Sequence, residues 1–366
     1  IILSKKLLDK DVSSCQFIKF EDSIKKTKFI KEINFLENFK IEIGEKQRYK
    51  DYFVNKQKNL ILKENLTIVD KDLFIPKDLN IKIYPGQKII LKNKAVIFSS
   101  SPWHVGEKNK RGVYIGGLKD NFGGGIIIKS DRGQKSIFTN TSFSYLSGPK
   151  NRIIKDDKKI KLISSSYVSN NKYINKTNDY YPDTYLNLID YEYLGAINLY
   201  NSQVEIDECD FKFMNSEDAL NVISSKFTIK NSFFKDNSSD AIDIDFGNGE
   251  IKNIKLENIG NDGIDISGSK VNLEKISLLN IGDKSLSVGE TADVNIKDFS
   301  SRNSFLGLVS KDGSKTFAKK IKFENVKIPF AAYRKKTSYD FGKLVVSDPI
   351  ILTKYMTKTL KDKNSN

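Results

Sequence analysis

The 366-residue chain is poor in cysteine and in long apolar runs. It has only 2 cysteines, Cys15 and Cys209, which lie far apart in the sequence. Cys209 sits within the run 204–211, whose pattern is typical of a strand, so we predict a buried free thiol rather than a disulfide. This leaves the redox compartment undecided. No run reaches the roughly eighteen apolar residues of a membrane span, so no transmembrane segment is expected.

Histidine and phosphate-loop motifs are also scarce. The sole histidine, His104, precedes the acidic repeats described below, and we interpret it as structural. Glycines occur at 116–117 and 123–125, but no Gly-Lys-Ser/Thr ending follows them, so we interpret them as tight turns of the chain. No basic cluster interleaved with aromatic residues forms a nucleic-acid motif, and we expect no nucleic-acid partner.

Charge of one sign is in excess, with 61 Lys and Arg against 46 Asp and Glu and a net charge of +15. This balance favours an anionic partner, whether acidic polysaccharide, nucleic acid or membrane surface. Most of the basic residues are lysine, and Lys, Asn and Ile are abundant throughout, which low-GC coding would also produce. Charge alone therefore leaves a functional and a compositional explanation open.

What the sequence does contain is a repeat of about 22 residues from Ala196 onward. Each repeat opens with a short alternating apolar stretch, such as 241–245, and a second follows about ten residues later. Alternation predicts strands, and a fixed period predicts a solenoid whose units bury their apolar edges on their neighbours. Two-helix repeats are longer, and the leucine pattern of leucine-rich repeats is missing, so an all-β, parallel β-helix is predicted. The segments begin at Ala196, Ala219, Ala241, Gly263, Ser285, Gly307 and Ala331.

The same reading divides the chain into three parts. Residues 1–58 show no clean period and are predicted to form an N-terminal cap or the edge of an upstream domain. The β-helix is expected at 59–350, with a polar, tyrosine-rich loop insertion near 149–193 that either lines a binding face or packs on itself. Residues 351–366 form a polar C-terminal tail. Because the chain begins at Ile1 and not at Met, we expect an additional domain upstream, and the lack of a signal peptide carries no weight.

A column of acidic residues is predicted at one corner of the coils. The position just before each first strand reads Asp218, Asp240 and Asp262, followed by Lys284. Carboxylates stacked about 5 Å apart repel by roughly 3 kcal/mol at an effective dielectric near 20, so something must neutralise them. Capping of exposed backbone N–H groups together with ion pairing to Lys284 is one explanation. A bound metal, calcium in particular, or a raised carboxylate pKa is the other.

A second column is predicted to face outward from the same strands, because its parity is opposite to that of the inward isoleucines. It includes Asp243 and Asp265, which with Lys284 are our candidates for proton transfer to a bound sugar. The alternative explanation is that any sheet face exposed to solvent is polar, whether or not it has a function. What favours a site is the density of acidic groups in three consecutive coils of a basic protein. Candidate binding residues at the same edge are Asn221, Glu217, Asp245, Glu290, Lys311 and Asp312.

These stretches carry a resemblance to a known family. Residues 75–89 resemble the opening coils of secreted right-handed parallel β-helices, and the acidic repeats resemble pectin-lyase-type modules of bacterial secreted proteins. The latter are especially similar to modules that accompany spore-coat-protein-H-like kinase domains. The resemblance covers roughly residues 60–350 and implies a right-handed β-helix at the cell surface or outside the cell. The motifs that carry it include 217–221, 239–243, 260–268 and 282–290.

The superfamily that this resemblance implies includes polysaccharide lyases, hydrolases and uronate epimerases, and also noncatalytic adhesins and tail fibres. Its calcium-dependent lyases use clustered acidic ligands and an Arg or Lys as Brønsted base, roles that Asp240, Asp243, Asp262 and Lys284 match. The Tyr-Gly-x-Asp-Pro-His pattern of alginate epimerases is absent. We therefore expect an extracytoplasmic module that binds, and in one version modifies, an acidic polysaccharide. The alternative is a noncatalytic structural or adhesin-like solenoid.

Overall fold

The computed structural model describes residues 47–130, 133–149 and 195–352 with their side chains. It also describes the backbone of two short antiparallel hairpins and of one further strand. The predicted insertion near 149–193, with its tyrosines, lies outside the described residues except for one of these hairpins, and so do most of residues 1–58 and most of the tail. The hairpins are β1 (Ser14–Ile18) with β2 (Ile24–Lys28) and β15 (Ile153–Asp156) with β16 (Lys159–Leu162), and the further strand is β30 (Leu360–Lys361).

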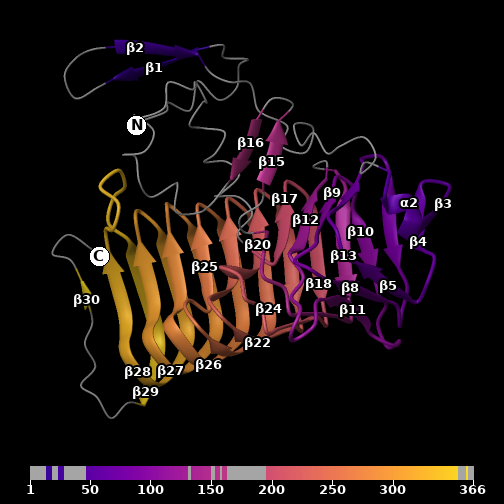
Figure 1. The fold of residues 1–366 in the computed structure, drawn as a ribbon. Helices are drawn as coiled ribbons and strands as arrows, with labels where there is room; N and C mark the ends of the chain where they lie inside the picture. Colours follow the sequence, from indigo (N-terminus) through magenta and orange to yellow (C-terminus); the bar gives the residue numbers. More distant parts are fainter. Residues whose placement is uncertain are drawn as a thin grey trace.

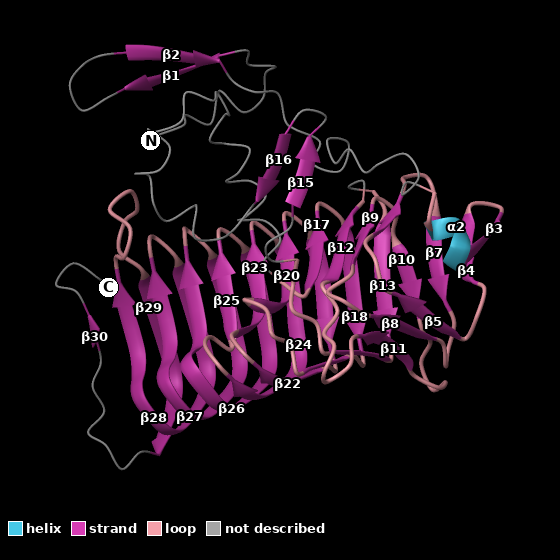
Figure 2. Cartoon of the chain, viewed as in Figure 1, coloured by secondary structure: helices cyan, strands magenta, loops and turns pink. Residues whose placement is uncertain are grey.

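The chain forms a right-handed parallel β-helix of about 10 coils, which confirms the predicted fold class (Figure 1). Each coil contributes one strand to each of three sheets in turn. In the cartoon, strands joined by short loops make up most of the coloured chain, and one short helix, α2, lies at one end (Figure 2). No helix within the described residues is long and apolar enough to cross a bilayer.

The three sheets are defined by their strands. The first sheet contains β6 (Leu73–Ile75), β9 (Val96–Ser99), β12 (Gly125–Lys129), β17 (Ile197–Tyr200), β20 (Asp218–Ile223), β23 (Asp240–Asp245) and β25 (Ile264–Ser267). The second contains β4 (Asn59–Leu62), β7 (Asn80–Ile83), β10 (Trp103–Val105), β13 (Lys135–Thr139), β18 (Gln203–Asp207) and β21 (Lys226–Lys230). The third contains β5 (Leu66–Val69), β8 (Lys88–Leu91), β11 (Val113–Gly116), β14 (Thr141–Ser144), β19 (Asp210–Lys212) and β22 (Phe233–Asn237).

Toward the C-terminal end the strands are long and bend from one sheet into the next. Three of them pass from the second sheet through the third into the first, and two pass from the second into the third. The three are β26 (Lys270–Gly289), β27 (Asp293–Lys311) and β28 (Lys315–Tyr333), and the two are β24 (Asn248–Ile259) and β29 (Lys343–Leu352).

The register of the strands places residues 22 apart side by side. Leu220 pairs with Ile242, and Asp243 pairs with Asp265. Equivalent residues of successive coils therefore form columns along the solenoid, as the period predicts.

Alternating burial builds the core. Ile242, Ile244, Ile264 and Ile266 point inward and are 0% exposed. Full burial of such a side chain contributes roughly 1.5–3 kcal/mol, so the stacked aliphatic columns hold the coils together.

Asparagines hold the corner between the third sheet and the first. The column runs Asp236, Asn258, Asn280, Asn303 and Asn325, and each amide donates to the preceding side chain at 2.7, 2.9, 2.9 and 2.8 Å. All five residues have φ between 53° and 59°. Asn and Asp tolerate this left-handed conformation better than other residues except glycine. The abundance of asparagine thus has a structural use at this corner.

The two ends of the solenoid differ. At the N-terminal end, α2 (Tyr49–Tyr52) and β3 (Phe53–Lys56) lie against the first coil, and β3 pairs antiparallel with β4. The aromatic rings of Tyr49 and Tyr52 pack against the core there. At the other end, β29 is bonded along one edge to β28.

The thiol of Cys209 and the ring of His104 lie in different surroundings. Cys209 is a free, buried thiol, as predicted, and burial raises its pKa to about 12. Its Sγ lies 3.4 Å from the carbonyl oxygen of Phe138. Cys15 lies in β1, whose side chains are not described. The ring of His104 is exposed, with Nε2 3.1 Å from the carbonyl oxygen of Lys135.

Candidate functional site

The predicted corner column exists on the first sheet, and its carboxylates cap backbone N–H groups. Asp240 Oδ1 accepts a hydrogen bond from the backbone N–H of Asp262 at 2.9 Å. Asp262 Oδ1 accepts in the same way from the N–H of Lys284, at 3.0 Å. The strands bend at this corner, so each carboxylate satisfies a donor of the next coil.

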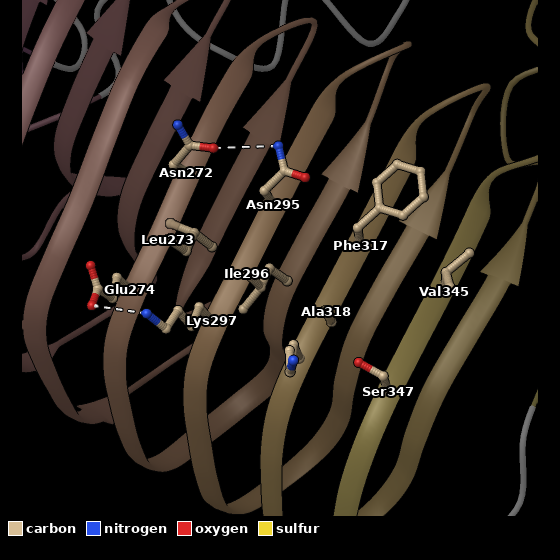
Figure 3. Close-up of a pocket in the computed structure, with 11 residues that line it drawn as sticks. Asn272, Leu273, Glu274, Asn295, Ile296, Lys297, Phe317, Ala318, Val345 and Ser347 are labelled. Atoms are coloured by element: carbon tan, nitrogen blue, oxygen red, sulfur yellow. Dashed lines mark hydrogen bonds and ion pairs between the residues drawn. The ribbon is translucent and has the colours of Figure 1, made fainter.

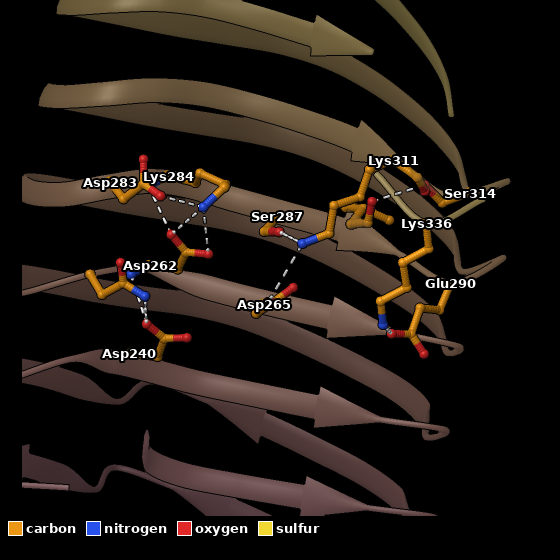
Figure 4. A network of polar contacts seen from close by, with 12 residues as sticks. Asp240, Asp262, Asp265, Asp283, Lys284, Ser287, Glu290, Lys311, Ser314 and Lys336 are labelled. Atoms are coloured by element: carbon orange, nitrogen blue, oxygen red, sulfur yellow. Dashed lines mark hydrogen bonds and ion pairs between the residues drawn. The ribbon is translucent and has the colours of Figure 1, made fainter. Parts of the chain in front are cut away.

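Lys284 neutralises one member of this column. Its Nζ lies 3.2 and 3.3 Å from the two carboxylate oxygens of Asp262 and also contacts Asp283 (Figure 4). Burial lowers the pKa of this ammonium group, but the bonds to Asp283 and Asp262 raise it more, so the net pKa lies above its usual value. Lys284 is therefore charged at neutral pH.

Among the described residues, the other two corner carboxyls, Asp218 and Asp240, have no lysine as an ion-pair partner. Burial and the charge of Asp262 raise the pKa of Asp240 to about 7, although Asn261 donates to its Oδ1 at 2.7 Å. Asp218 is buried, and burial together with Asp240 raises its pKa well above the usual range. Asn221 Nδ2 donates to Asp218 Oδ2 at 3.1 Å. Part of the predicted repulsion is thus relieved by protonation.

The outward column brings further carboxyl groups to the same face. Asp243 is half-buried, and burial followed by the neighbouring Asp245 and Asp218 raises its pKa well above the usual value. Burial, Asp265 and Glu290 likewise raise the pKa of Asp245 to about 7. The raised pKa values favour the acid form of these groups, which can donate protons, over that of ordinary aspartates.

Asp265 lies between these acids and a buried lysine. Its Oδ1 is buried without a hydrogen-bond partner among the described residues, and its Oδ2 lies 3.9 Å from Lys311 Nζ. Lys311 Nζ donates to Ser287 Oγ at 2.7 Å, and its side chain is only 11% exposed. Its aliphatic stem crosses Gly289, where an added Cβ would lie 2.8 Å from Lys311 Cε. The glycine therefore gives the lysine room to reach two earlier coils.

Two of the predicted binding residues, Glu290 and Asp312, lie at the rim of this site. Both contact the turn that contains Lys336, which is distant from them in the sequence. Glu290 pairs with Lys336, as Figure 4 shows. Asp312 is fully buried, and its Oδ1 accepts from the backbone N–H groups of Lys335 and Lys336 at 2.7 Å each. Asp312 thus holds the turn that carries Lys336. Glu217, the remaining candidate, is exposed at the edge of β20.

The donor set available for a metal differs from the predicted one. Asp240, Asp262 and Asp265 have oxygens within 4.8 Å of one another, so Asp265 takes the place expected for Asp218. Calcium takes roughly six to eight oxygen ligands. Both oxygens of Asp262 bond to Lys284, and Asp240 Oδ1 already accepts two hydrogen bonds. In this arrangement Asp240, Asp262 and Asp265 do not fit a calcium ion unless the side chain of Lys284 moves away. Calcium binding therefore stays a prediction.

Comparisons with known proteins add little to this geometry. No protein-family model matches the chain, and no curated protein matches it. Among solved structures, a mutant of the periplasmic alginate epimerase AlgG is similar, with 9% sequence identity and a TM-score of 0.29. That likeness covers 85% of this chain and 81% of the other. A similarity this weak leaves function to the site itself.

Sequence reasoning located most of this site and missed three features. Asp283 precedes Lys284 directly, and its bond to that lysine depends on a rotamer that no pattern reveals. Lys336 lies where the repeat fades, 46 residues after Glu290. The third feature lies on another face, the outer side of the second sheet. There Lys343 lies opposite Lys315 although the two are 28 residues apart, so the regular period does not predict their pairing.

Proposed function

We propose that this chain is an extracytoplasmic module that binds an acidic polysaccharide along the outer face of the first sheet and acts on it by acid–base chemistry. The observation that carries the proposal is the environment of the Asp265 carboxylate. Its buried Oδ1 has no partner among the described residues, and it lies beside Asp243 and Asp245, whose pKa values burial raises. A buried polar atom left without a partner costs free energy and is common where a ligand completes the site.

Binding would use the repetition of the coils. Columns of side chains recur about every 4.8 Å along the solenoid, which suits an extended polymer. Protonated Asp243 and Asp245 can donate hydrogen bonds to sugar carboxylates or hydroxyls without charge repulsion. Lys311 and Lys336 supply positive charge at the same edge.

The chemistry would divide between two carboxyl groups with different surroundings. Asp243, held as an acid, is placed to give a proton to a glycosidic oxygen. Asp265 is the proposed acceptor, taking a proton from the sugar or from an attacking water. Lys284 remains charged, so its proposed part is to hold Asp262 and not to act as the Brønsted base that the family resemblance implies.

The rival function is a noncatalytic solenoid, and one observation favours it. Asp240 and Asp262 cap backbone N–H groups of the next coil, which is a purely structural task. Capping does not explain Asp243 or Asp265, because neither carboxyl accepts a hydrogen bond from a backbone N–H among the described residues. The two functions therefore predict different results for these two residues.

The test compares Asp243→Asn and Asp265→Asn with Asp262→Asn. If the proposal holds, the first two variants unfold at the wild-type temperature but no longer process uronate polymers, and they lose the share of binding that the first sheet contributes. Asp262→Asn should instead lose stability, because it leaves Lys284 with one carboxylate fewer. Wild-type glycan retention and product formation by both Asp243→Asn and Asp265→Asn would leave the structural function standing.

The setting proposed for this module comes from the family resemblance. We propose a secreted or cell-surface bacterial protein in which the β-helix accompanies a second domain of the spore-coat-protein-H-like kinase type. The complete open reading frame tests this directly, and a reading frame without any kinase-like segment would remove that context.

A further inference from the structure

The outer face of the second sheet carries more lysines than carboxylates near its C-terminal end, although Asp293 on β27 lies opposite Lys315. Lys315 on β28 lies directly opposite Lys343 on β29, and Lys319 lies farther along β28. All three side chains are exposed. Within the described part of the chain, none of them has an ion-pair partner. Like charges placed directly opposite each other on neighbouring strands destabilise a sheet.

Earlier coils of the same sheet are balanced differently. Lys252 Nζ lies 2.9 Å from Glu274, and Lys297 Nζ lies 3.9 Å from the same carboxylate. Lys230 lies 3.8 Å from Glu205. Carboxylates thus lie next to several lysines of these coils, whereas the same columns carry no carboxylate on β28 and β29. The excess positive charge is therefore local and not spread evenly over the sheet.

An exposed aromatic ring lies among these lysines. Phe317 points outward between Lys315 and Lys319 and is 43% exposed, whereas the preceding coils have Asn272 and Asn295 in the same column. Val345 follows it in that column and is 44% exposed.

A hollow surrounds these residues. It is open and measures about 450 Å³, and Figure 3 shows the ring of Phe317 beside the linked amides of Asn295 and Asn272, 3.3 Å apart. Glu274, Lys297, Lys319 and Ser347 also line it, and Glu274 is paired with Lys252 and Lys297. Together with Lys315 and Lys343 at its edge, we call this surface the basic hollow.

We infer that the basic hollow is a second binding site, for the acidic groups and sugar rings of an anionic polysaccharide. The ring of Phe317 offers an apolar face to a sugar ring, and the amides and Ser347 offer hydrogen bonds to hydroxyls. The lysines pair with carboxylate or sulfate groups and lose their mutual repulsion when the polymer binds. The site shares no residue with the acidic columns of the first sheet and stands independently of the chemistry proposed there.

The composition of the basic hollow favours a glycan over a nucleic acid. Its cations are lysines, whose ammonium groups act as point charges. None of its lining residues is an arginine, whose guanidinium group forms bidentate hydrogen bonds with phosphate. It offers one aromatic ring among its lining residues, whereas single-stranded nucleic-acid sites stack successive bases on several. A polymer with isolated acidic groups and intervening sugar rings matches this arrangement.

The test measures equilibrium binding of the 366-residue chain to five probes at low and high salt. The probes are polygalacturonate, heparin, neutral dextran, single-stranded DNA and anionic lipid vesicles. The variants are the triple change K315Q, K319Q and K343Q, and the single change Phe317→Asn. Asparagine is chosen because the preceding coils carry it in that column. The matched control is K88Q, K255Q and K322Q, which removes the same charge from exposed lysines of the third sheet.

We expect the wild-type chain to bind one of the two anionic glycans and not dextran, and binding to weaken with salt. The triple variant should raise Kd roughly tenfold, and Phe317→Asn about fivefold, while the control changes it less than about twofold. Equal effects of the triple variant and its control would overturn the inference. So would tighter binding to DNA or vesicles than to either anionic glycan, or no binding to any of the five.

The variant Asp243→Asn distinguishes a failure of the first-sheet proposal from a failure of the basic hollow. Asp243→Asn changes only the acidic face, so it should retain binding at the basic hollow while losing any processing of the polymer. Loss of all glycan binding in Asp243→Asn, with the triple lysine variant unchanged, would place the polymer on the first sheet alone and refute the basic hollow.

Discussion

Lys284 Nζ lies 3.2 Å from Asp262 Oδ1, one coil away along the corner column of the first sheet. Both side chains are largely removed from water, with exposed fractions of 17% and 4%. One lysine therefore compensates Asp262, whereas Asp218 and Asp240 of the same column have no ion-pair partner among the described residues. This relationship decides both the stability of the corner and its capacity for cations.

Removing the lysine should destabilise the fold. In Lys284→Met the carboxylate of Asp262 stays buried without its ammonium partner, and breaking a buried pair on one side costs about 3 kcal/mol or more. Urea unfolding at neutral pH measures the change in the free energy of unfolding. Lys255→Met, an exposed change on the third sheet, is the control and should be nearly neutral. Equal midpoints for the two variants would contradict the importance of the pair.

The same lysine should compete with a divalent cation. Lys284→Gln removes the ammonium group from both oxygens of Asp262, and Oδ1 keeps only the backbone N–H of residue 284. Calcium affinity should therefore rise by about tenfold over the wild-type chain, because the oxygens of Asp240, Asp262 and Asp265 lie close together. Isothermal titration calorimetry with calcium measures both proteins. If neither protein takes up calcium at millimolar concentration, this group of carboxylates is not a calcium site.

Stability should fall as the pH rises from mildly acidic to mildly basic. The pKa of Asp240 and Asp245 is about 7 in the folded chain, against an ordinary value of 3.8, so the folded state binds more protons between these limits. The free energy of unfolding therefore decreases as pH rises through this window and is highest below it.

The double variant Asp240→Asn with Asp245→Asn isolates this effect. Its unfolding midpoint should fall less than that of the wild type between about pH 5 and about pH 8. Exposed Asp120→Asn serves as the control and should follow the wild type. A wild-type pH dependence in the double variant would show that these groups are not held as acids.

Activity on a uronate polymer should require the acid form of Asp243. Its pKa is raised, so product formation should decline on the alkaline side as this group loses its proton. Asp243→Asn should reduce turnover by about 100-fold or more, because general acid catalysis typically contributes that factor. A pH–rate profile of the wild type and a turnover measurement on the variant check this. Unchanged turnover in the variant would remove Asp243 from the chemistry.

The asparagine column should matter for stability and not for binding. Asn280→Ala removes hydrogen bonds to Asn258 and Asn303 and forces alanine to adopt φ near 58°. We expect a loss of about 2 kcal/mol, measured by urea unfolding. Asn280→Gly separates the two causes, since glycine accepts the backbone conformation and loses only the bonds. If the glycine variant is as unstable as the alanine variant, backbone strain contributes nothing.

Much of the site was predictable because a solenoid converts a period into a position. Asp243 and Asp265 lie 22 residues apart and pair in register, so counting along the chain places them side by side. The ion pair of Lys284 with Asp262 follows from the same counting. The contact between Asp312 and the turn at Lys336 could not be predicted by counting, because that turn lies beyond the last regular repeat.

The sequence by itself determined the fold class, the coil length and the columns in which acidic and apolar residues stand, because strand parity and a fixed period leave little choice of register. Only the tertiary structure decided which carboxyls are protonated and which are paired. Those states depend on burial and on distances of a few ångströms between side chains of different coils, and no residue pattern encodes them. It also revealed the basic hollow, whose lysines stand out only once their neighbours on adjacent strands are known.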